Sequence, residues 1–124
     1  MRYLTLEEVL ILHSFQIEKF GGKPGILNAK LLESAVMRPQ STFSGKSLYK
    51  DVYTKASALA IGIIQNHPFL DGNKRTGMHA MLTFLELNSI HVSLSDKDVV
   101  SMGNKIAQKS ISLKKLSKLL EEKS

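Results

Sequence analysis

The chain has 124 residues, with 43% hydrophobic and 23% charged residues, which is typical of a folded protein and excludes a disordered chain. The absence of cysteine excludes disulfide bonds and thiolate metal sites, and no apolar run approaches the roughly 20 residues of a membrane-spanning helix. No signal peptide is recognisable, so we expect a cytoplasmic protein of one domain, residues 1–124, whose net charge of +6 favours an acidic partner: a nucleic acid, a nucleotide or an acidic protein surface.

The first third of the chain predicts two helices. Thr5 opens a capping box that precedes apolar residues at helical spacing, so a helix is expected over 5–20. The glycine-rich turn 21–25 permits a left-handed cap that ends this helix. Asn28 is the N-cap expected for a second, short helix that stops before Pro39. Its expected apolar side comprises Leu31, Leu32, Ala35 and Val36.

The middle of the chain predicts a buried central helix. Before it, residues 38–50 have no sustained periodicity, so they form either a solvated connector or a functional flap. Residues 51–66 are apolar around most of a helical circumference, which is typical of a buried helix. His13, in the apolar stripe of the first helix, is expected to be a structural, hydrogen-bonded histidine.

Three helical segments follow the loop after residue 66. The first begins near Gly72 or Asn73, and Asn88-Ser89 ends it. Residues 90–94 form an edge strand or an extended link, and a capping box at Ser95 starts the next helix. Regularly spaced leucines mark a final helix from Leu113. We interpret the lysines of the last two helices as a solvated face, or alternatively as a surface for an acidic partner: Lys105, Lys109, Lys114, Lys115, Lys118 and Lys123.

Polar groups concentrate in the stretch 67–76, between two apolar helices. The first-turn backbone amides of the helix after Gly72 form an anion site, to which Arg75 adds a bidentate clamp and Lys74 a mobile charge. Asp71 is either a simple helix cap or the ligand of a magnesium ion. An imidazole can take up and release a proton under physiological conditions, so His67 is a candidate general base for a hydroxyl nucleophile. Together these groups indicate a phosphate-handling site.

The residues His67-Pro68-Phe69-Leu70-Asp71-Gly72-Asn73-Lys74-Arg75 resemble the motif of the Fic/Doc superfamily, and Asn-Lys-Arg-Thr is closest to its death-on-curing (Doc) toxins. The resemblance implies an all-α, compact bundle of about six helices. It also implies transfer from ATP or another nucleoside triphosphate, with His67 as general base, Asp71 as Mg²⁺ ligand, and Gly72, Asn73, Lys74 and Arg75 at the phosphates. Phe69 would anchor the loop in the core, and a flap within 42–49 would align the target peptide.

Two residues differ from the general Fic pattern. Lys74 replaces a glycine of the anion hole, and Met78 stands where most Fic proteins have a second arginine. By resemblance to Doc, both indicate a kinase that transfers the γ-phosphate to a threonine or serine, with elongation factor Tu as the suggested target and translation arrest as the outcome. No inhibitory helix motif is recognisable; the nearest segment, 117–122, lacks the final small residue. Inhibition is therefore expected in trans, from an antitoxin.

Three functions remain open at this point. The first is a toxin kinase, the second an adenylyltransferase of the same fold, and the third a non-catalytic basic binding module. Intact Pro68 and Gly72-Asn73 favour the second function, whereas Lys74 and Met78 oppose it. Direct nucleic-acid binding is not expected, because the chain has no tryptophan and no alternation of aromatic and basic residues.

Overall fold

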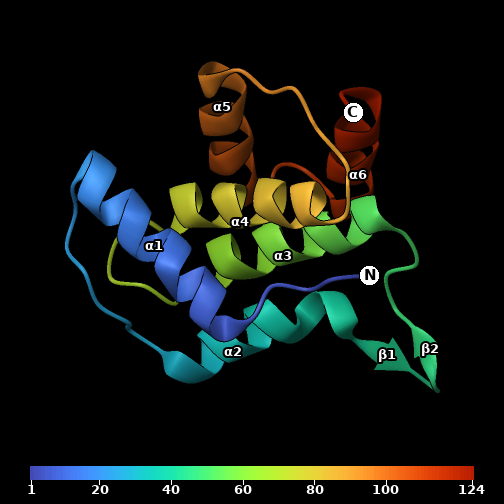
Figure 1. Ribbon diagram of the computed structural model, residues 1–124, viewed down its shortest axis with the longest axis horizontal. Helices are drawn as coiled ribbons and strands as arrows, with labels where there is room; N and C mark the ends of the chain where they lie inside the picture. The colour runs from blue at the N-terminus through green and yellow to red at the C-terminus, as the bar shows by residue number, and fades with distance from the viewer.

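The computed structural model describes residues 1–124 and confirms the predicted all-α fold (Figure 1). A 3-10 helix, η1, and an antiparallel hairpin of two short strands interrupt the helices between α2 and α3. No helix has both the length and the apolar character needed to cross a membrane. The elements are α1 Leu6–Phe20, α2 Ala29–Met37, η1 Arg38–Gln40, β1 Thr42–Phe43, β2 Lys46–Ser47, α3 Val52–Asn66, α4 Asn73–Leu87, α5 Asp96–Ala107 and α6 Leu113–Glu122.

The helices begin where local capping signals predict. Thr5 Oγ1 accepts a hydrogen bond from the backbone of Glu8, whose carboxylate accepts the Thr5 N–H in return. Asn28 caps α2, and Ser95 caps α5 in the same reciprocal way. The expected left-handed cap at the end of α1 is wrong: Gly21 has φ 83° and ψ 177°, a conformation that glycine tolerates but that is not helical.

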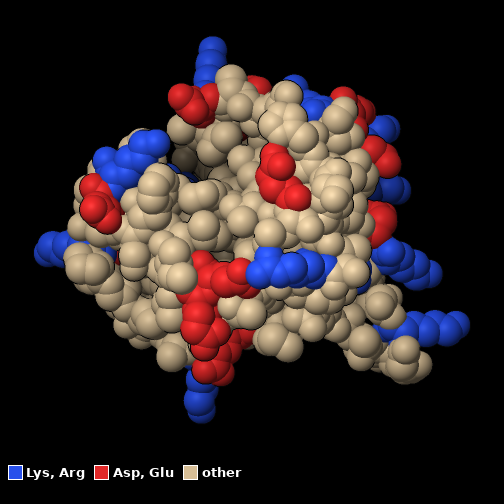
Figure 2. All heavy atoms as spheres, in the orientation of Figure 1, with Lys and Arg blue, Asp and Glu red and all other residues tan.

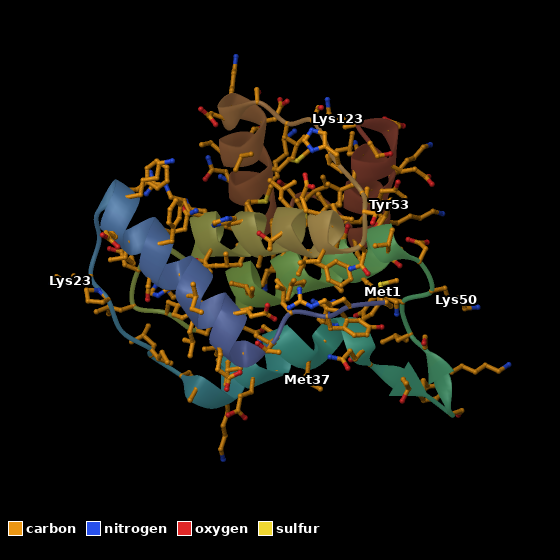
Figure 3. All side chains as sticks on the ribbon, in the orientation of Figure 1. Met1, Lys23, Met37, Lys50, Tyr53 and Lys123 are labelled. Atoms are coloured by element: carbon orange, nitrogen blue, oxygen red, sulfur yellow. The ribbon has the colours of Figure 1, made fainter.

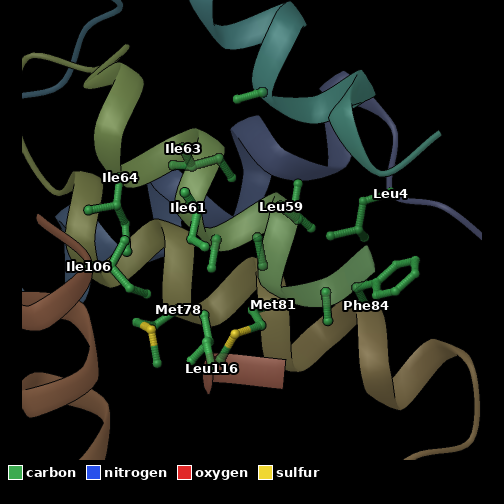
Figure 4. Packing of buried hydrophobic residues seen from close by; sticks show 14 of the residues in the cluster. Leu4, Leu59, Ile61, Ile63, Ile64, Met78, Met81, Phe84, Ile106 and Leu116 are labelled. Carbon is green, nitrogen blue, oxygen red and sulfur yellow. The ribbon is translucent and has the colours of Figure 1, made fainter. Parts of the chain in front are cut away.

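Helix α3 is the centre of the molecule, as predicted. It lies alongside α4 in the ribbon view, and the other helices pack around this pair (Figure 1). Close packing depends on Gly77 of α4, where a Cβ atom would lie 2.6 Å from Cγ1 of Ile64. Figure 4 shows the apolar side chains that fill the space between the helices. Leu31 is an exception to the prediction for α2, because this side chain is 39% exposed.

Lys55 is a buried cation that the apolar pattern of α3 does not reveal. Its Nζ donates to the carbonyl oxygens of Tyr49 at 2.7 Å and of Pro39 at 3.4 Å, on either side of the hairpin. Arg38 adds a second contact at the hairpin base, donating from Nε to the Tyr49 hydroxyl at 2.8 Å. The hairpin is therefore fixed at its base while residues 42–48 are exposed. Figure 3 labels Lys50, which follows the hairpin and precedes α3.

The hairpin does not reach the predicted phosphate site. It projects from the start of α3, whereas His67 follows the end of this helix (Figure 1). The 12 positions between Lys55 and His67 correspond to about 18 Å along a helix. Residues 42–49 were expected to align a target peptide at the site. The structure does not support this role, because the length of α3 separates these residues from His67. Residues 90–94 form an extended link without a strand, and Ser93 donates its N–H to the Lys123 carbonyl at 3.0 Å.

Candidate active site

The loop between α3 and α4 is bounded by two left-handed residues. His67 ends α3 with φ 50° and ψ 54°, and Gly72 precedes α4 with φ 79° and ψ 17°. A left-handed conformation is unfavourable for a residue with a Cβ atom, and such residues concentrate at functional sites. His67 is exposed at this turn. The backbone thus holds the imidazole outside the core, where it is accessible to a substrate.

Asn73 fixes the shape of this loop from inside. Its side chain is 4% exposed, accepting the Phe69 N–H at 2.9 Å and donating to the Phe69 carbonyl at 2.9 Å. These two contacts define which end of the amide is oxygen and which is nitrogen. The nitrogen also lies 3.1 Å from Nδ1 of His67, so Nδ1 accepts this hydrogen bond. The Asn73 side chain therefore organises the loop, and its backbone amide belongs to the first turn of α4.

Phe69 anchors the loop in the core, as predicted. The side chain is fully buried, and its ring stacks on His13 with 3.7 Å between centroids and 5° between planes. Residues 25–28 supply a further support that the sequence did not reveal. Leu27 donates its N–H to the Pro68 carbonyl at 2.7 Å, and Leu70 donates to the Gly25 carbonyl at 3.0 Å. Hydrogen bonds to a segment far away in sequence thus hold both flanks of Phe69.

Asp71 is not the cap of α4, because Gly72 occupies that position and no side chain caps the first turn. Its Oδ1 accepts the Gly72 N–H at 3.0 Å, and its Oδ2 accepts the Lys23 N–H at 3.3 Å. Gly22 allows this approach, since a Cβ atom there would lie 2.9 Å from Oδ2. The carboxylate is exposed and retains free lone pairs on both oxygens. One such carboxylate beside a phosphate site fits the coordination habits of magnesium.

The first turn of α4 faces a cavity of about 500 Å³. The first intrahelical hydrogen bond runs from the Thr76 N–H to the Gly72 carbonyl at 3.0 Å, so the backbone N–H groups of Asn73, Lys74 and Arg75 before it are free to bind an anion. Figure 2 shows the surface hollowed between the end of α1 and α5, on the side where α4 begins. The cavity is lined by Ile64, His67, Leu70, Asp71, Gly72, Asn73, Lys74, Arg75, Met78, Val99, Val100, Gly103, Asn104 and Ala107.

The two cations of the motif contact different helices. Lys74 Nζ donates to the side-chain oxygen of Asn104 on α5 at 3.0 Å. The guanidinium of Arg75 lies 4.5 Å above the ring centroid of Phe20, at the end of α1. Both residues are exposed and line the cavity, so each is accessible to an anion bound there. Met78, in contrast, is buried at 1% exposure and forms part of the apolar wall.

All six residues predicted for the site line this one cavity: His67, Asp71, Gly72, Asn73, Lys74 and Arg75. The α5 wall was missed. Its apolar residues Val99 and Val100 follow an ordinary amphipathic pattern, so no local signal distinguishes them from core positions. Gly103 inside the same helix is the one unusual feature, because a glycine in a helix interior often marks a close approach.

Comparisons with known proteins agree with the fold and the motif. The family model described as Fic/DOC family matches residues 3–85. Toxin Doc of Mycolicibacterium smegmatis is 40% identical over 97 residues, covering 78% of this chain and 72% of the relative. Protein kinase doc of Escherichia phage P1 is 28% identical over 115 residues, covering 90% of both chains. The chain therefore belongs to the Fic/DOC family.

Proposed function

We propose that this protein is the toxin of a toxin–antitoxin pair and transfers the γ-phosphate of ATP to a serine or threonine hydroxyl of a target protein. The observation that carries the proposal is that His67, Asp71 and the uncapped start of α4 line one cavity. The names of the two relatives, a toxin and a protein kinase, support the same activity. We take residues 1–124 as one Fic/Doc domain.

The phosphates of the nucleotide bind at the first turn of α4 in this proposal. The backbone amides after Gly72 supply hydrogen-bond donors, Arg75 supplies a planar clamp and Lys74 a point charge. Asp71 would hold the magnesium ion, which supplies charge neutralisation to the phosphates when bound. Val99 and Val100 offer an apolar wall for the rest of the nucleotide. Transition-state stabilisation by these groups is electrostatic, as phosphoryl transfer requires.

His67 acts as the general base that takes the proton of the target hydroxyl. Its Nδ1 faces the Asn73 amide, so Nε2 is the nitrogen available to the hydroxyl. A neutral ring that accepts at Nδ1 carries its proton on Nε2. To take the proton of the target hydroxyl, Nε2 must be unprotonated, so the ring must carry its proton on Nδ1 instead. We propose that the hydrogen bond between Asn73 and Nδ1 opens when the substrates bind, which permits this tautomer.

Lys74 and Met78 favour phosphate transfer over nucleotide transfer. The Lys74 side chain crosses from α4 to Asn104 of α5, so it occupies space that a glycine would leave to the outer phosphates. Met78 presents a buried apolar surface where a second arginine would bind the terminal phosphate. Adenylyl transfer is the alternative, favoured by the unobstructed backbone at Gly72 and Asn73. Lys74→Gly is the substitution expected to shift the reaction toward it.

Intact-mass spectrometry of target proteins, after incubation of a cell extract with this protein, ATP and magnesium, tests the proposal. We expect a gain of one phosphate group on the target, and purified elongation factor Tu is the first target to examine. A gain of a whole nucleotide would establish adenylyl transfer instead. His67→Asn is the matched inactive variant, because asparagine tolerates the left-handed conformation, and it should lower the rate by about 10²- to 10⁴-fold. Unchanged transfer or toxicity in this variant would contradict the role of His67.

Inhibition in trans by an antitoxin is the other part of the proposal. No residue of α6, which contains the segment 117–122, lines the cavity, so this segment does not block the site. Ile11 and Phe15 of α1 are exposed apolar side chains, which supports a protein partner on this helix. Co-expression with the product of a neighbouring gene should restore growth and yield a complex on gel filtration. Ile11→Lys should weaken this complex without lowering phosphate transfer.

A further inference from the structure

His13 makes two contacts with the loop that carries the proposed metal ligand Asp71, although His13 and Asp71 lie 58 positions apart in the sequence. Its ring stacks on Phe69, and its Nε2 lies 2.8 Å from the Asp71 carbonyl oxygen. The same ring edge lies under Gly72, where a Cβ atom would be 3.6 Å from Nε2. The imidazole is 5% exposed, so solvent contributes little to its surroundings.

The hydrogen bond to Asp71 defines the state of the His13 ring. A carbonyl oxygen can only accept, so Nε2 carries a proton and donates it. The contact also orients the peptide that joins Asp71 to Gly72. The carbonyl of this peptide is turned toward α1, so its N–H, which belongs to Gly72, points the opposite way. This N–H donates a hydrogen bond to Asp71 Oδ1 at 3.0 Å. The imidazole of His13 thus determines the direction of the Asp71–Gly72 peptide. The direction of this peptide in turn orients both the Asp71 carboxylate and the start of α4.

We infer that His13 is a positioning residue, which holds the Asp71–Gly72 peptide so that the Asp71 carboxylate faces the cavity for a divalent cation. The inference rests on the proposed function, because it assigns a cation to Asp71. The stack on Phe69 positions the ring, and the Nε2–H holds the peptide through its hydrogen bond to the Asp71 carbonyl. A histidine that only filled the core would act through the stack, so substitutions that separate the two contacts distinguish these roles.

Two substitutions separate the contacts. His13→Phe keeps an aromatic ring on Phe69 and removes the donor, whereas His13→Gln keeps a donor near the position of Nε2 and removes the stack. We expect His13→Phe to raise the half-saturating Mg²⁺ concentration for ATP binding by about 3- to 10-fold. His13→Gln should stay closer to the wild type. The matched control is His91→Phe, a surface histidine paired with Glu86, which should change nothing.

Binding is measured by isothermal titration with ATP and Mg²⁺ in the His67→Asn background, where turnover does not interfere. A larger defect in His13→Gln than in His13→Phe, or equal binding in all variants, would overturn the inference. Hydrogen exchange of residues 69–75 provides a second readout without nucleotide, and we expect faster exchange in His13→Phe than in His13→Gln. If the wild type binds no nucleotide, the proposed function fails, and hydrogen exchange alone decides whether His13 positions the loop.

Discussion

Asn73→Ala should be the most damaging substitution in the loop, because one side chain satisfies two buried backbone groups. Alanine leaves the N–H and the carbonyl of Phe69 without partners, in a place where Phe69 itself is fully buried. Each unpaired buried group costs about 1–3 kcal/mol. Allowing for partial relief by water, we expect the free energy of unfolding to fall by about 2–4 kcal/mol. This loss is a large fraction of the stability of an ordinary domain.

Urea unfolding followed by circular dichroism measures this loss, with Asn66→Ala as the matched control. Asn66 makes one side-chain hydrogen bond, donating to the Leu31 carbonyl at 3.0 Å, so its removal should cost about 1 kcal/mol. Asn73→Ala should also lower phosphate transfer at temperatures where the variant is folded, since the loop that carries His67 and Asp71 loses the side chain that fixes its shape. Equal losses of stability in the two variants would refute the reasoning, because they would show that the Phe69 backbone does not depend on Asn73.

Four further predictions concern stability, and urea unfolding, repeated at several pH values for the last, measures each of them. Gly103→Ala should stabilise the protein by about 0.5–1 kcal/mol through helix propensity, since the new Cβ would lie 3.6 Å from Lys74 and Met78. Gly77→Ala should be about 1–3 kcal/mol worse than Gly103→Ala, because of its clash with Ile64; equal effects would show that α3 and α4 separate easily. Thr76→Val should stabilise by about 1 kcal/mol, because the buried Thr76 hydroxyl has no hydrogen-bond partner, and a loss of stability would reveal a hidden one. Burial, and secondarily the charge of Lys19, lowers the pKa of His79 below its ordinary value of 6.5, so protonation favours the unfolded chain. Stability should therefore be full above pH 6.5 and fall as the pH decreases, and His79→Asn should flatten this slope between pH 7 and 5; an unchanged slope would assign it to other groups.

The helices of this protein are determined largely by local sequence. Thr5, Asn28 and Ser95 cap the helices that they were predicted to cap, because a capping hydrogen bond joins residues only two or three positions apart. The apolar residues of α3 likewise identify the buried helix, since a side chain in the centre of a bundle has no solvent-facing side. The candidate site was predictable for the same reason: its six residues are contiguous, or nearly so, in the motif.

Tertiary structure alone decided how these residues are supported. The contacts of His13 with Asp71, and of Lys55 with the base of the hairpin, join segments whose relative position depends on helix packing. The direction of the Asn73 side chain depends on the path of the loop at Phe69, and the distance between the hairpin and His67 depends on the length of α3. A sequence specifies local caps and apolar faces through neighbouring residues. It specifies contacts between distant residues only through the packed core, which therefore decided the surroundings of the site.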